Sequence, residues 1–155
     1  RVAFLRTGSS LANEPNKRKA GFENGCLSRK LKYEMLILGD EESYDKFDAF
    51  LTEHKIDGKL SFDGIFCVTD KIARYVINVL KKMNIRVPED VQVIGFDGIR
   101  QLGDFDYLCS TIVQPVQEMA QLCVDLLFQE ASPARPQLYC LPVSYVCGGT
   151  TREIT

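Results

Sequence analysis

GIFCVTD (64–70), KIARYVINVLKKMNI (71–85) and RVPEDVQVIGFDG (86–98) are the three consecutive phrases that decide the fold of this chain. The apolar runs Ile65–Val68 and Val91–Ile94 are typical of strands buried on both faces. Between them, apolar side chains recur at steps of three and four residues, the spacing of a helix with one apolar face; they are Ile72, Ala73, Val76, Ile77, Leu80 and Met83. Residues 64–98 therefore predict one βαβ unit of a parallel sheet.

Polar side chains stand at the carboxyl end of each predicted strand. Thr69 and Asp70 follow the first strand, and Asp97 closes the second in a Gly-Phe-Asp-Gly turn. Because open parallel sheets bind ligands outside the carboxyl ends of their strands, these three residues are candidates for one ligand site. A structural alternative stays open for each, since Thr69 and Asp70 can cap the helix and Asp97 can be a turn residue.

The segments before this unit continue the alternation of strand and helix. Strands are expected at 1–7 and 35–38, helices from about 13 and about 44, and a polar connection at 55–63. The order βαβαβαβ predicts an α/β fold with a doubly wound parallel sheet and right-handed crossovers. Arg18 falls near the start of the first helix, which places it at the same edge of the sheet as Thr69 and Asp97.

The carboxyl-terminal third is less regular. Residues 110–115 form a short β-prone segment that a proline stops, and 116–130 predict an amphipathic helix. A loop is expected at 131–137, a strand or pair of strands broken at Pro142 over 138–147, and a polar tail over 148–155.

Composition excludes several classes of function. With 155 residues, 45% of them hydrophobic, and a net charge of −2, the chain predicts one globular domain without the basic surface that grips DNA or anionic lipid. No apolar run is long enough to span a membrane. The six cysteines include no Cys-x-x-Cys pair and read as small buried hydrophobes of a reducing cytosol. His54 is the single histidine, so we expect no metal, no cofactor and no catalytic Cys–His pair.

Several phrases, in this order, carry a resemblance to a known family. They are Arg18-Lys-Ala-Gly21-Phe22, Val68-Thr69-Asp70-Lys-Ile-Ala73, Val87-Pro88-Glu-Asp90-Val91, Val93-Ile94-Gly95-Phe96-Asp97, Ser110-Thr111-Ile112-Val113-Gln114-Pro115, Glu118-Met119-Ala120, and Leu141-Pro142-Val143 leading to Thr150-Thr151. Together they cover nearly the whole chain, which resembles the effector-binding domain of the LacI/GalR transcriptional regulators.

The resemblance implies a periplasmic-binding-protein-like fold, in which two three-layer α/β/α lobes enclose a ligand. Residues 1–109 would form the carboxyl-terminal lobe, 110–137 the hinge crossing and a helix of the amino-terminal lobe, and 138–155 the return strands and tail. The chain opens with Arg1 and not Met, so we expect a piece of a longer protein whose helix-turn-helix headpiece and remaining lobe lie outside it. The apolar face of 116–128 would then dock on its own lobe or, preferentially, on another copy.

The resemblance also assigns site residues. Arg18 and Asp97 match the arginine and aspartate that bind the ligand, Thr69 matches a cleft-facing position beside Asp70, and Gln114 lies at the hinge. Glu41 stands near a position where some members stack an aromatic ring on a sugar, and its acidity predicts a ligand with a donor-rich or cationic group. For Arg18 the alternative is a surface ion pair with Glu14 or Glu23.

Three hypotheses of function follow. The first is a cytoplasmic, homodimeric transcriptional regulator of the LacI type, a repressor or an activator, which senses a sugar or related metabolite and reads operator DNA through its headpiece. The second is a periplasmic sugar-binding protein of a transport system, which shares the fold. The third is a flavodoxin-like α/β enzyme, which the sequence disfavours because it has no glycine-rich phosphate loop and no nucleophile paired with a base.

Overall fold

The computed structural model describes residues 1–8, 13–39, 44–100, 107–128 and 138–153. Its elements, in chain order, are β1 (Val2–Arg6), α1 (Asn13–Ser28), β2 (Tyr33–Ile37), α2 (Asp45–Glu53), β3 (Lys55–Ile56), β4 (Lys59–Leu60), β5 (Gly64–Cys67), α3 (Asp70–Lys82), β6 (Gln92–Asp97), β7 (Ser110–Val113), α4 (Val116–Leu127) and β8 (Ser144–Val146). The predicted βαβ unit is confirmed as β5, α3 and β6.

The six-stranded sheet has the order β2-β1-β5-β6-β7-β8. All neighbours run parallel except β7 and β8, which are antiparallel. Because the chain turns from β1 to β2 on one side and then crosses to β5 on the other, the sheet is doubly wound and its order reverses at β1. The segment 110–113, expected to open the crossing to a second lobe, is therefore a strand of this sheet.

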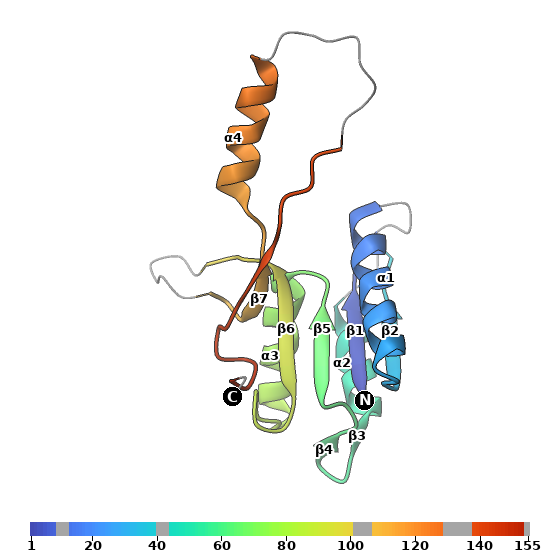
Figure 1. Ribbon diagram of the computed structural model, residues 1–155. Helices are drawn as coiled ribbons and strands as arrows, with labels where there is room; N and C mark the ends of the chain where they lie inside the picture. The colour runs from blue at the N-terminus through green and yellow to red at the C-terminus, as the bar shows by residue number, and fades with distance from the viewer. Residues whose placement is uncertain (9–12, 40–43, 101–106, 129–137, 154–155) are drawn as a thin grey trace.

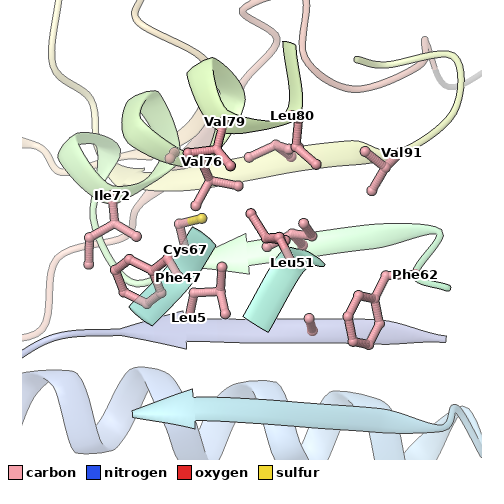
Figure 2. Packing of buried hydrophobic residues seen from close by; sticks show 14 of the residues in the cluster. Leu5, Phe47, Leu51, Phe62, Cys67, Ile72, Val76, Val79, Leu80 and Val91 are labelled. Atoms are coloured by element: carbon pink, nitrogen blue, oxygen red, sulfur yellow. The ribbon is translucent and has the colours of Figure 1, made fainter. Parts of the chain in front are cut away.

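Helices cover both faces of the sheet, which makes three layers (Figure 1). On one face, Phe22 of α1 packs against Phe4 of β1, with ring centroids 5.3 Å apart, and against Phe66 of β5. On the other face, α2 and α3 bury Phe47, Leu51 and their neighbours against Leu5 and Cys67 (Figure 2). The predicted α/β/α architecture is confirmed.

Helix α3 is anchored at both ends. The Thr69 hydroxyl accepts a hydrogen bond from the Ile72 N–H at its start, which satisfies a backbone donor that the first helical turn leaves without a partner. At its end, Asn84 adopts a left-handed φ of 58°, the conformation that terminates many helices. The capping residue is thus Thr69, and Asp70 is the first residue inside the helix.

The connection 55–63 differs from the expectation, because it contains the small hairpin β3–β4. Its turn is Asp57-Gly58, with φ angles of 50° and 80°. This pair is the preferred sequence of a two-residue hairpin turn, since both positions need positive φ. Strands of two residues are too short to show an alternating pattern, so the turn was the one available signal.

Helix α4 begins at the predicted residue but projects from the sheet (Figure 1). None of its residues is buried, so it does not dock on the sheet of the described chain. Docking on another copy stays a prediction. Of the return segment 138–147, expected to be one strand or two, Ser144–Val146 alone forms a strand. No helix in the described ranges is long and apolar enough to cross a membrane.

All six cysteines are free, but half of them are not core residues. Cys26, Cys67 and Cys109 are buried as expected, whereas Cys123, Cys140 and Cys147 are exposed. The prediction for Cys123 is wrong because it follows from the apolar run of α4, whose apolar face has no partner among the described residues.

Candidate functional site

The carboxyl edge of the sheet gathers polar residues from four elements. Arg18 comes from α1, Thr69 follows β5, Asp97 ends β6, and Gln114 follows β7. Parallel strands bring their carboxyl ends to one edge, and α1 begins at that edge because β1 leads into it. This rule predicts the grouping of Arg18, Thr69 and Asp97, and the family resemblance adds Gln114. The distances below show that Arg18 and Gln114 both contact Asp97.

Arg18 is held at three points. Its Nη1 donates to the carbonyl oxygen of Val68 at 2.7 Å, and its Nη2 lies 3.3 Å from Oδ1 of Asp97. The guanidinium also stacks over the ring of Phe96, 3.8 Å from the ring centroid. With 17% of its side chain exposed, Arg18 is not the solvated surface residue of the alternative interpretation. Glu23, one proposed partner, lies near Lys19 instead.

Asp97 occupies a strained backbone position. Its φ is 122°, a conformation that residues with a side chain rarely adopt, and Gly98 follows with φ 76°. A Cβ on Gly98 would lie 2.9 Å from Cγ1 of Val113, so the turn requires glycine there. Strain of this kind persists only where the surroundings enforce it, and it concentrates at functional sites.

Gln114 completes the contact by donating from Nε2 to Oδ1 of Asp97 at 2.9 Å. Burial raises the pKa of the Asp97 carboxyl above its ordinary value, whereas the charge of Arg18 and the hydrogen bond from Gln114 oppose that rise. Among the described residues, Oδ2 of Asp97 and Oε1 of Gln114 have no partner. Both atoms can accept hydrogen bonds from a ligand.

Thr69 and Asp70, adjacent in sequence, have different surroundings. Thr69 is half-buried, and its hydroxyl proton remains available because its oxygen accepts from the Ile72 N–H. Asp70 is fully buried, and its carboxylate accepts from the Ile99 N–H, the Thr111 hydroxyl and the Cys109 thiol. The structure thus places Asp70 beneath the edge, and Glu41 lies outside the described residues.

Two residues that sequence reasoning missed take part in this arrangement. Phe96 carries the stacked guanidinium of Arg18, and Thr111 accepts from the Gly98 N–H at 3.3 Å while donating to Asp70. An aromatic residue directly before the turn was a usable signal, since arginine stacks readily on rings. The sequence holds no comparable signal for Thr111, because its hydroxyl reaches Asp70 only when β7 pairs with β6.

Two grooves adjoin the site, both beside Gln114. One of about 450 Å³ is lined by Arg100, Gln114, Glu118 and Ser144 together with neighbouring residues. The other, of about 430 Å³, lies between α4 and residues 138–143. Arg18 and Asp97 line neither groove, and their side chains are 17% and 27% exposed. The described residues hold no cluster of three or more metal-ligating side chains.

The profile of the periplasmic binding protein-like domain matches residues 1–151. The chain belongs to this family. This membership agrees with the resemblance of the sequence phrases to the LacI/GalR regulators. The sucrose operon repressor of Pediococcus pentosaceus is 32% identical over 152 residues, which cover 93% of this chain and 45% of that protein.

Two solved structures share the fold of this periplasmic binding protein-like domain. A dimeric Lac repressor superposes with a TM-score of 0.79 at 22% identity, covering 97% of this chain and 55% of that one. A LacI family transcriptional regulator from Lactobacillus casei with bound sucrose gives 0.68 at 24% identity, with 97% and 57% covered. The chain therefore spans about half the length of the proteins that it matches.

Proposed function

We propose that this domain binds a small polyhydroxylated effector, a sugar or related metabolite, at the carboxyl edge of its sheet and thereby controls a LacI-type DNA-binding regulator. The observation that carries the proposal is the contact of Arg18, Asp97 and Gln114, which come from three separate elements. That the relative from Pediococcus pentosaceus is named a sucrose operon repressor supports a sugar as the effector.

The chemistry of these residues fits a hydroxyl-rich ligand. Arg18 has only donors, Asp97 only acceptors, and Gln114 has both, so neighbouring hydroxyls can each donate to one group and accept from another. Charge-assisted hydrogen bonds of this kind are the strong ones. In the proposed complex, Asp97 Oδ2 and Gln114 Oε1 accept from the ligand and the Thr69 hydroxyl donates to it. Glu41 is kept as a candidate contact on the resemblance alone.

The topology supports a division of the chain between two lobes. Strand β8 returns to pair with β7, so residues 1–113 and 144–153 meet in one sheet, whereas α4 leaves that sheet directly after Gln114 and Pro115. We propose that the hinge crossing lies at 114–115 and that α4 belongs to a second lobe. Effector binding would then change how the two lobes close, a coupling between two sites.

The partners proposed for the whole protein are operator DNA, through a headpiece, and a second copy of the chain. The names of the relatives, which are transcriptional repressors and regulators and not enzymes, support a cytoplasmic regulator that acts on DNA. The same names disfavour the alternative of a transport protein, which shares this fold.

A calorimetric screen of sugars, sugar phosphates and purines against the full-length protein tests this proposal. We expect a ligand whose affinity falls at least about tenfold in Arg18→Ala and in Asp97→Asn, because each variant removes a charge-assisted hydrogen bond worth about 1.5–3 kcal/mol. Arg86→Ala is the matched control, since Arg86 also pairs with an aspartate, Asp90, but on an exposed surface.

The outcome decides between two interpretations of the site. Loss of binding in both site variants, with binding intact in Arg86→Ala, supports the effector site. Binding that survives both substitutions overturns the assignment of Arg18 and Asp97. Absence of binding by every compound on the panel overturns the proposed ligand class.

A further inference from the structure

Asp70 is a buried carboxylate with donors on three sides. The Ile99 N–H lies 2.7 Å from its Oδ2, while the Thr111 hydroxyl and the Cys109 thiol lie 2.6 Å and 3.6 Å from its Oδ1. None of the Asp70 side chain is exposed to solvent. A buried charge is tolerated only when it is paired or hydrogen-bonded, and here the donors come from the loop after β6 and from the start of β7.

The backbone of β6 leaves room for the Asp70 carboxylate. A Cβ on Gly95 of β6 would lie 2.2 Å from Oδ1 of Asp70, so glycine is required for the carboxylate to fit. Burial and the nearby Asp70 charge raise the pKa of the Cys109 thiol to about 12, which keeps that thiol protonated as a donor.

The hydrogen bonds around Asp70 include those of the two backbone amides that follow Asp97. The Ile99 N–H donates to Asp70 directly, and the Gly98 N–H donates to the Thr111 hydroxyl, which in turn donates to Asp70. Asp97 itself has the strained φ of 122°. Such a conformation persists only when its neighbours enforce it, and these two hydrogen bonds fix the two amides that directly follow Asp97.

The same network reaches the hinge. Thr111 lies on β7, three residues before Gln114, and β7 is paired in register with β6 so that Asp97 faces Val113. One buried carboxylate therefore ties together the turn that presents Asp97 and the strand that leads to Gln114. The positions of Asp97 and Gln114, the proposed ligand contacts, therefore depend on Asp70, which is buried beneath the edge.

We propose that Asp70 is a positioning residue, which sets ligand affinity by fixing the Asp97-Gly98 turn against β7 without contacting the ligand. This inference rests on the proposed function for its effect on affinity. Its structural part, that Asp70 and Thr111 hold the turn, stands independently of any ligand.

The test uses Asp70→Ala, Thr111→Val and Thr111→Ser in the full-length protein. Thr111→Val removes the hydroxyl at nearly unchanged shape and Thr111→Ser restores it. Asp48→Ala is the matched control, because it removes another aspartate that accepts a side-chain hydrogen bond, from Tyr75, on the α2–α3 contact. If Asp70→Ala does not fold, the two Thr111 variants carry the test.

The first measurement is hydrogen exchange of the Gly98 and Ile99 amides. We expect these amides to exchange at least about tenfold faster in Asp70→Ala and Thr111→Val, and at the wild-type rate in Thr111→Ser and Asp48→Ala. Unchanged exchange in Thr111→Val shows that the network does not hold the turn and overturns the proposal. This result does not depend on any ligand, so it separates failure of the proposal from failure of the proposed function.

The second measurement is calorimetric affinity for sucrose, or for the screened compound that binds wild type, in a double-mutant cycle with Asp97→Asn. We expect Thr111→Val to weaken binding roughly tenfold in the wild-type background and to have almost no further effect beside Asp97→Asn, as for residues that act through one network. An equal loss in both backgrounds, or no loss in either, indicates a merely structural role and overturns the positioning role.

Discussion

Helices α3 and α4 show the same kind of sequence pattern but differ in burial. Both carry apolar residues at steps of three and four. Helix α3 buries Ile72, Val76 and Leu80 among others, whereas α4 buries no residue and leaves Leu127 80% exposed. An amphipathic pattern therefore predicts a helix with an apolar face to be covered, but it does not indicate which surface covers that face.

The difference follows from what lies on each side of the helix in the chain. Helix α3 connects β5 and β6, which pair with each other, so a right-handed crossover must lay it on the sheet. Helix α4 leaves the carboxyl end of β7 after Pro115 and projects from the sheet, and β8 of the described returning segment pairs with β7, so no residue of α4 is buried (Figure 1).

Thiol labelling gives the largest contrast between the two regions. Cys67 lies in the core beneath α3 and Cys123 is exposed on α4. Burial raises the pKa of the Cys67 thiol well above its usual value, and a reagent reaches that thiol only when the core opens. We expect an alkylating reagent to modify Cys123 at least about a thousandfold faster than Cys67, as mass spectrometry of time points can show.

The concentration dependence of this labelling tests whether a second copy covers α4. If it does, Cys123 is protected at high protein concentration while sedimentation reports a mass above that of one chain. Unchanged labelling with a strictly monomeric mass contradicts docking on another copy. Cys123→Ser identifies the labelled site.

Truncation of one leucine in each helix gives the next contrast. Leu80→Ala on α3 should lower the free energy of unfolding by about 2–5 kcal/mol, because the Leu80 side chain is fully buried and its removal leaves a cavity in the core. Leu127→Ala on α4 should stay within about 0.5 kcal/mol of wild type. Urea denaturation of this chain measures both, and similar losses in the two variants would show that the α4 face is covered.

A smaller effect is expected at the contact of α2 with α3. The Tyr75 hydroxyl donates to Oδ1 of Asp48 at 2.7 Å, and this hydrogen bond, with burial, raises the pKa of Tyr75 to about 12. Tyr75→Phe should therefore cost about 1 kcal/mol of unfolding free energy at neutral pH.

The pH dependence of that contribution has a definite sign. The folded chain holds the phenol proton more tightly than the unfolded chain, so the stabilisation is complete below pH 10 and is lost as pH rises toward 12. Spectrophotometric titration should show one late-ionising tyrosine that is absent in Tyr75→Phe. If the component that Tyr75→Phe removes instead has its midpoint near pH 10, the hydrogen bond is absent in solution.

Local patterns were sufficient for the fold and for part of the site. The βαβ unit, the parallel sheet and a helix cap at Thr69 or Asp70 follow from hydrophobic spacing and residue chemistry within about 35 residues, and the structure assigns the cap to Thr69. Placing Arg18 and Asp97 at one edge needed only the rule that parallel strands share their carboxyl ends, whereas Gln114 was assigned through the family resemblance. The ion pair of Arg18 with Asp97 and the hydrogen bond from Gln114 to Asp97 show that the three residues lie together.

Asp70 shows where that reasoning ends. Because Asp70 is adjacent to Thr69 in the sequence, it was also expected at the edge. Its carboxylate instead lies beneath the edge and accepts hydrogen bonds from Ile99 and Thr111, which are 29 and 41 residues away in sequence. Whether a carboxylate faces a ligand or a buried donor depends on those distant partners. No local pattern contains them.

Periodicity, capping and crossover handedness act over short stretches of chain, so the sequence predicts the order of the main strands and helices, the doubly wound sheet, and the position of Arg18, Thr69 and Asp97 at its carboxyl edge. Which distant residues touch one another depends on the tertiary structure. It stacked Arg18 on Phe96, buried Asp70 beneath the turn and left the apolar face of α4 without a partner in the described chain. Burial and hydrogen bonding depend on what other segments bring to the same place, and that information is distributed over the whole chain.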